Sequence, residues 1–272
     1  MCGQSVIMSV KERMLSRRDV MLSTAGAATA GAAAAAAPFP AWGAMPKAVS
    51  DLTHELHAEF PTFDGGQQFF MDQKFNWKDH TFNLFELRLN EHIGTHIDAP
   101  LHFSEDRHSV AEIPVSSLIA PLAVVDIRAK AADDADAQVT PDDIKAWIGR
   151  HGPVPDRACV AMNSGWSARV ATAKFRNADS SKVMHFPGFH VETSQMLRET
   201  TTALGLAVDT LSLDYGPSQD FATHNDWLPT NRWGLENIAH LDTVPAVGAT
   251  LVVGAPKHRG GSGGPSRVLA LM

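Results

Sequence analysis

The chain has 272 residues, of which 30 are acidic and 23 are basic, so its formal net charge is −7 at pH 7. Sequence-independent nucleic-acid binding relies on a basic face, and attachment to an anionic membrane relies on basic clusters. The charge balance therefore argues against both kinds of partner. The length suits one α/β domain or two small ones, with a sizeable hydrophobic core.

Residues 1–44 differ in composition from the rest of the chain. A short basic stretch is followed by an uncharged Ala/Gly-rich run over residues 20–37, which is the order of segments in an export signal. Residues 16–22 (SRRDVML) resemble the twin-arginine signal of bacteria. A transmembrane anchor or a disordered tail is the alternative. The Ala/Gly-rich run is too weakly apolar to favour a transmembrane anchor. We expect a twin-arginine-type signal peptide with an uncertain cleavage point, a periplasmic location and no stable membrane insertion after processing.

Residues 45–272 show no internal repeat and no second linker, so they are expected to form a single domain. Removal of the signal would also remove Cys2 and leave Cys159 alone, which excludes an internal disulfide in the mature chain. Cys159 lies in an apolar run and is expected to be buried and unreactive.

Strand and helix patterns are mixed along this domain. Thr140 followed by Pro141 and an acidic first turn predicts the start of a helix that ends near Gly149 or Gly152. A second helix is predicted over residues 192–201. The Gly-rich residues 260–264 lack the ending of a phosphate-binding loop and are expected to form a turn. Strands are predicted at residues 82–89, 122–127, 158–162, 204–213, 251–253 and 268–271. These strands and helices together indicate an α/β domain with a mixed β-sheet flanked by helices.

Three histidines and an aspartate lie within residues 92–102 (HIGTHIDAPLH). On a helix, Asp98 would point roughly 200° away from His96. In an extended segment, His92, His96 and Asp98 are separated by even numbers of residues, so their side chains project to the same side. Imidazole and carboxylate groups are ligands suited to zinc, manganese or iron. A single histidine is more often a surface or hydrogen-bonded residue, but this spacing favours a metal site formed by His92, His96 and Asp98, from which His102 stands off after Pro100.

The same run resembles the His-x-Gly-Thr-His-x-Asp-x-Pro-x-His signature of the cyclase family of metal-dependent hydrolases, which includes bacterial kynurenine formamidases (arylformamidases) and isatin hydrolase. The resemblance extends over nearly the whole mature chain. It includes residues 51–54 (DLTH), 164–166 (SGW), 186–189 (FPGF) and 208–214 (VDTLSLD).

The resemblance implies a swivelling β/β/α-like fold and a fuller site. His224 and Glu236 have the spacing of the family's remaining ligands, so Asp98, His224 and Glu236 would complete a second or shared metal position. His102 would be the acid/base residue. The implied cofactor is a divalent metal, Zn²⁺ or Mn²⁺, as one or two ions, and the implied assembly is a homo-oligomer.

The loop at residues 61–66 (PTFDGG) departs from the Pro-x-Trp-Pro-Gly-Asp loop of kynurenine formamidases, because Phe63 replaces the tryptophan. We therefore expect a relative with a different small-molecule substrate. Phe63 and Trp166 are the candidate substrate contacts, and His185 and His190 flank a Pro-Gly turn that could line the pocket.

The expected activity is hydrolysis of a C–N bond in an amide, formamide or cyclic amide, through metal-activated water with His102 as acid/base. The substrate is expected to be small and aromatic or cyclic. A lactone hydrolase or a lyase-type cyclase reaction at the same site is the alternative enzyme. A periplasmic metal-dependent binding protein without turnover is the alternative from another class.

Overall fold

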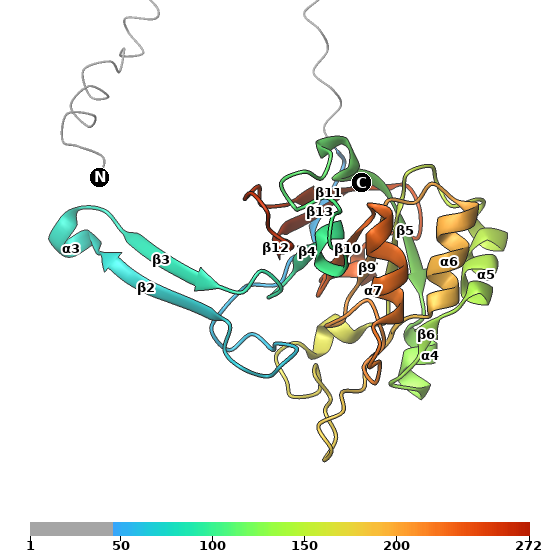
Figure 1. Ribbon diagram of the computed structural model, residues 1–272, viewed down its shortest axis with the longest axis horizontal. Helices are drawn as coiled ribbons and strands as arrows, with labels where there is room; N and C mark the ends of the chain where they lie inside the picture. The colour runs from blue at the N-terminus through green and yellow to red at the C-terminus, as the bar shows by residue number, and fades with distance from the viewer. Residues whose placement is uncertain (1–45) are drawn as a thin grey trace, which may run out of the picture. The chain divides into compact units, whose positions relative to one another are not determined.

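A nine-stranded mixed sheet forms the centre of residues 46–272, the part of the chain that the computed structural model describes (Figure 1). The predicted signal peptide and Cys2 lie outside these residues. Across the sheet the strand order is β1 (Val49–Asp51), β13 (Arg267–Leu271), β11 (Ala249–Gly254), β5 (Ile119–Asp126), β7 (Cys159–Asn163), β9 (Gly205–Val208), β10 (Trp233–Glu236), β4 (His96–Asp98) and β12 (Gly263–Pro265). The contacts β5–β7, β7–β9 and β9–β10 are parallel and the others are antiparallel, so the predicted α/β fold with a mixed sheet is confirmed.

The parallel strands at the centre are buried on both faces, as their apolar sequences require. Along β5, Leu122 and Val124 pack into one hydrophobic cluster, while Ala123 and Val125 pack into another on the opposite face. Helices α5 (Pro141–His151) and α6 (Val191–Thr200) cover the second face. The indole N–H of Trp147 on α5 donates to the carbonyl of Val124 at 2.9 Å, which ties this helix to the sheet.

Helix α5 begins where the sequence predicts. Thr140 and Asp143 form a reciprocal capping box, and Asp143 accepts the backbone N–H of Thr140 at 2.7 Å. None of the helices among residues 46–272 is long and apolar enough to span a membrane. The other helices are short: α3 (Trp77–His80), α4 (Arg128–Asp133), α7 (Ala222–Trp227) and the 3-10 turns η1 (Pro100–Phe103), η2 (Val115–Ser117), η3 (Trp166–Arg169), η4 (Leu228–Thr230) and η5 (Leu241–Thr243).

Two small sheets lie outside the main one. Strands β6 (Gln138–Val139) and β8 (Gly188–Phe189) form a parallel pair. Strands β2 (Phe69–Phe75) and β3 (Leu84–Leu89) form an antiparallel ribbon that extends away from the main sheet (Figure 1).

Two predicted elements differ from the structure. The strand expected over residues 204–213 ends at Val208, because the chain turns at Asp209, whose carboxylate accepts hydrogen bonds from Ser164 and from the Trp166 backbone. The Gly-rich segment expected to be a turn contributes β12, which pairs with β4. A Cβ atom at Gly263 would lie 2.7 Å from Cε1 of His92, so this edge strand needs glycine to approach the histidine.

Candidate active site

The pairing of β4 with β10 sets the centre of the site. His96 and Asp98 are two residues apart on β4 and therefore point to the same face. Glu236 on β10 lies directly opposite His96 in the antiparallel register. All three side chains are buried, with at most 6% of each residue exposed. The sheet thus brings two carboxylates and an imidazole together away from water.

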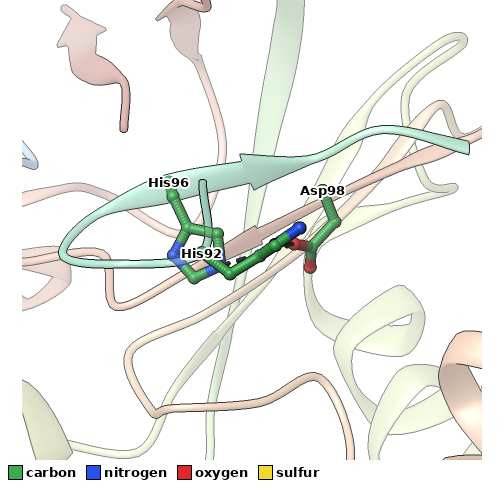
Figure 2. A group of neighbouring side chains, drawn as sticks. All are labelled: His92, His96 and Asp98. Carbon is green, nitrogen blue, oxygen red and sulfur yellow. Dashed lines mark hydrogen bonds and ion pairs between the residues drawn. The ribbon is translucent and has the colours of Figure 1, made fainter. Parts of the chain in front are cut away.

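His92 reaches the same point from the loop before β4 rather than from one continuous extended segment. Gly94, with a φ of +66°, turns the chain between His92 and His96. Figure 2 shows His92 and His96 approaching Asp98, with Nδ1 of His92 2.8 Å from Oδ1 of Asp98. His96 and Asp98 therefore share a face because both lie on the strand, as their spacing predicts, whereas the position of His92 depends on the turn at Gly94.

The orientation of His92 is fixed from its outer side. Its Nε2 lies 2.9 Å from the hydroxyl of Ser262, and that hydroxyl donates to Glu91 at 2.6 Å. Glu91 also contacts His258, a histidine for which the sequence indicates no partner. These contacts leave Nδ1 of His92 as the nitrogen that faces the centre of the site.

The fourth and fifth candidate ligands come together on the other side of Asp98. His224, on α7, has Nε2 3.1 Å from Glu236 and 3.7 Å from Asp98. Its Nδ1 lies 2.6 Å from Asp214, which also accepts the backbone N–H of Thr223 at the start of α7. Asp214 thus positions both the short helix and the imidazole ring that it carries.

The arrangement of these atoms fits a divalent metal. Nε2 of His96 lies 3.3 Å from Asp98 and 3.3 Å from Glu236, yet neither this nitrogen nor Oδ2 of Asp98 has a hydrogen-bond partner in the described chain. Two ligands of a tetrahedral zinc ion, each about 2.0–2.2 Å from the metal, lie about 3.3 Å apart. Ligand atoms fall into two compact groups that share Asp98: His92, His96 and Asp98, and Asp98, His224 and Glu236.

The charges of the buried ligand cluster also favour a bound cation. Burial by itself lowers the pKa of His96, but the neighbouring carboxylates of Asp98 and Glu236 raise it to about 10. The pKa of His224 is raised as well, because hydrogen bonds to Asp214, Asp98 and Glu236 outweigh the effect of burial. The cluster therefore holds excess negative charge in a buried place, which a bound cation would neutralise.

His102 stands beside the cluster and outside both ligand groups. It lies on η1, and its ring stacks on that of His92 with a centroid separation of 3.8 Å and an interplanar angle of 23°. Burial lowers the pKa of His102 to about 4. Its position agrees with the expectation that the chain turns at Pro100 and separates His102 from the ligands.

A cavity of about 310 Å³ opens over the cluster. Its floor includes His92, His96, His224 and Glu236, and His102 also lines it. The wall is aromatic: the ring of Phe221 lies 5.9 Å from that of Phe63 and 5.7 Å from that of Phe103, measured between centroids. A cavity of this size, in which an aromatic wall faces a cluster of polar side chains, is typical of a site for a small molecule.

The structure places Phe63 at the cavity but does not place Trp166 there. Trp166 is fully buried, and its indole N–H donates to the carbonyl of Phe175 at 2.8 Å. His185 is paired with Asp136 at 2.8 Å, and His190 caps the start of α6. Neither of these two histidines lines the cavity, so the pocket role considered for them is not seen.

Several residues of the site were not identified from the sequence. Asp214 belongs to the segment 208–214 that resembles the family, yet its role depends on its contact with His224 across ten residues. Phe103 and Phe221 become neighbours only through folding. The position of Phe103 next to His102 is the one local signal that could have indicated a place in the cavity.

Fold and site together define a metal-dependent hydrolase of mixed α/β architecture. Residues 50–215 match the model of the Cyclase family, described as "Putative cyclase". Isatin hydrolase of Roseibium aggregatum is 34% identical over 193 residues, which cover 68% of this chain and 73% of that protein. Kynurenine formamidase of Salinibacter ruber is 26% identical over 224 residues, covering 82% and 96%.

A solved structure of isatin hydrolase A from Labrenzia aggregata, bound to benzyl benzoate, superposes with a TM-score of 0.78. It is 30% identical in sequence, and the match covers 83% of this chain and 93% of that one. The chain belongs to the cyclase family. It is a hydrolase of the class that acts on C–N bonds, similar to the arylformamidases.

Proposed function

We propose that this enzyme hydrolyses the C–N bond of an amide, a formamide or a cyclic amide in a small aromatic or cyclic molecule. The observation that carries the proposal is the buried ligand cluster beneath a cavity whose wall is formed by Phe63, Phe103 and Phe221. Flat rings pack well against aromatic side chains in tilted or edge-on geometry, so this wall suits an aromatic substrate. The names of the relatives, isatin hydrolase and kynurenine formamidase, support the same class of reaction.

The cofactor that we propose is zinc or manganese, as one ion or as two ions that share Asp98. The donor set supports this choice, since three imidazoles and two carboxylates supply nitrogen and oxygen ligands without a thiolate. A divalent metal held there would polarise a substrate carbonyl and lower the pKa of a bound water molecule towards about 7.

In this proposal His102 moves the proton. Its ring lies in the cavity, stacked on His92 and with its centroid 6.0 Å from that of His224. From this position the imidazole accepts the proton of the attacking water and delivers it to the leaving nitrogen. Such a positioned acid/base contributes about 10²- to 10⁴-fold to the rate. Asp214 keeps His224 directed at the ligand cluster, and the phenylalanine wall excludes water from the reacting carbonyl.

Hydrolysis of a panel of formanilides, isatin-type cyclic amides and aryl lactones tests the proposal. Wild-type protein, His102→Ala and a control variant, His151→Ala, are compared with matched metal content. His151 is exposed at the end of α5 and belongs neither to the ligand groups nor to the residues that line the cavity. We expect amide turnover in the wild type and the control, and a loss of at least 100-fold in His102→Ala without loss of metal.

Three other results would each count against the proposal. Turnover of lactones alone would replace the C–N reaction with ester chemistry. Metal binding without turnover of any substrate would indicate a binding protein. Full activity in His102→Ala would remove the acid/base role from this histidine.

A further inference from the structure

Phe63 is carried by a loop whose own hydrogen bonds give it a defined shape. The carboxylate of Asp64 accepts the backbone N–H of Gly66 at 2.9 Å and the side-chain amide of Gln68 at 2.9 Å. The hydroxyl of Thr62 donates to the carbonyl of Gly66 at 2.7 Å. All three contacts are local, so they shape the loop without fixing its place relative to the rest of the cavity.

Arg176 joins this loop to a segment 113 residues further along the chain. Its Nη2 donates to the carbonyl of Phe63 at 2.9 Å, and the two segments lie side by side in Figure 1. The guanidinium also lies against Gly65, where a Cβ atom would come within 2.7 Å of Nη1 and 3.0 Å of Cζ. Because Gly65 also has a φ of +80°, both the backbone and the approach of the arginine require glycine at this position.

The segment that carries Arg176 is itself anchored on both sides. Phe175 before it is fully buried and packs in one cluster with Trp166. Asn177 after it donates through its side chain to the carbonyl of His185 at 2.8 Å. In the described part of the chain no carboxylate lies within ion-pair distance of Arg176, so its hydrogen bond to the loop is not a by-product of an ion pair.

We propose that Arg176 is a positioning residue for substrate selection, an inference that rests on the proposed hydrolysis of aromatic amides. The ring of Phe63 is 38% exposed, so burial alone does not fix it, and its centroid lies 5.9 Å from that of Phe221. By holding the carbonyl of Phe63, Arg176 sets the separation of the two rings and hence how closely they pack on a flat substrate. A contact of this kind strengthens binding of the substrate and of the transition state alike, so its loss raises KM more than it lowers kcat.

Kinetics of Arg176→Ala with formanilide test the proposal, and Arg150→Ala is the matched control. Arg150 also donates to a backbone carbonyl, that of Ala146 at 3.2 Å, but this contact lies within α5 and Arg150 does not line the cavity. We expect KM to rise about tenfold in Arg176→Ala with kcat within about twofold of the wild type, and neither value to change in the control. Arg176→Lys is expected to recover part of the loss, because its ammonium group donates to the same carbonyl.

A double-mutant cycle with Phe63→Leu distinguishes positioning of the ring from a general loss of structure. If Arg176 acts through the ring, Arg176→Ala raises KM by less than about twofold in the Phe63→Leu background. Equal effects of Arg176→Ala in the two backgrounds would overturn the proposal. A wild-type KM in Arg176→Ala would overturn it as well.

Hydrogen exchange reports on the loop without any substrate. Amides of residues 62–68 are expected to exchange about tenfold faster in Arg176→Ala than in the wild type or in Arg150→Ala, while those of α6 keep a constant rate. Unchanged exchange of the loop would overturn the proposal even in a protein that hydrolyses amides. Faster exchange in a protein that turns over no amide would support the positioning contact and overturn the proposed function instead.

Discussion

Asp214 lies 2.6 Å from Nδ1 of His224, and this contact turns Nε2 of the same ring toward Glu236 and Asp98. Carboxylates that hold a metal-binding histidine in this way fix its tautomer and orientation, and their loss costs about 10- to 100-fold in metal affinity. We expect Asp214→Asn to weaken zinc binding by that factor, because the amide no longer accepts as strongly from the ring and from the N-terminus of α7. Competition with a chromophoric chelator measures the affinity.

The control for this variant is Asp220→Asn, an exposed aspartate in the loop before α7. It removes the same charge without touching His224. Equal affinities of the two variants would show that Asp214 has no part in metal binding.

Ser262 has a comparable relationship to His92. Its hydroxyl lies 2.9 Å from Nε2 of His92 and donates to Glu91, so it orients the ring from the outer side. We predict that Ser262→Ala lowers metal affinity about tenfold. Ser266→Ala is the matched control, because Ser266 is buried nearby but bonds to the carbonyl of Gly264. Indistinguishable zinc titrations of the two alanine variants would contradict the assigned role of Ser262.

Phe63 tests the aromatic wall of the cavity. Its ring packs 5.9 Å from that of Phe221, and contacts between aromatic rings contribute about 0.5–1.5 kcal/mol beyond the area they bury. Phe63→Leu keeps most of the bulk and removes the ring, so kcat/KM for an aromatic amide is expected to fall about tenfold. Metal content should stay the same. An unchanged kcat/KM for aromatic substrates would place substrate binding elsewhere in the cavity.

Cys159 provides a test of the core rather than of the site. It lies on β7 in the centre of the sheet, and burial raises the pKa of its thiol above the ordinary range. A buried neutral thiol is a poor nucleophile. In full-length Cys2→Ser protein, we therefore expect no reaction with Ellman's reagent in the native state and one equivalent after denaturation in guanidinium. Rapid labelling of the native protein would disprove this burial.

The parts of the fold that depend on local chemistry were predictable from the sequence. The start of α5 follows from the cap at Thr140, and the shared face of His96 and Asp98 follows from their spacing of two on a strand. The residues at which strands end were harder to predict from the sequence. Strand β9 ends where Asp209 bonds to Ser164, 45 residues away in the chain, and no local pattern indicates such a contact.

The site shows the same division between local and distant information. The run at residues 92–102 indicated a metal site by its own residue types, but His224 and Glu236 could be assigned only through the family resemblance. Their meeting depends on the register of β4 with β10 and on the contact between Asp214 and α7. Trp166 neighbours a family segment in sequence, yet its side chain packs away from the cavity, because proximity along the chain does not fix side-chain direction.

The most direct test of the central claim is a zinc and manganese titration of metal-free wild type and His96→Ala, followed by elemental analysis and thermal unfolding. Ligand at 100 times its Kd stabilises a folded protein by about 2.7 kcal/mol, so bound metal should raise the Tm of the wild type by several degrees. The account predicts one or two equivalents of tightly bound metal in the wild type and a large loss in His96→Ala, with His151→Ala unchanged. Equal metal content and equal Tm in wild type and His96→Ala would contradict it.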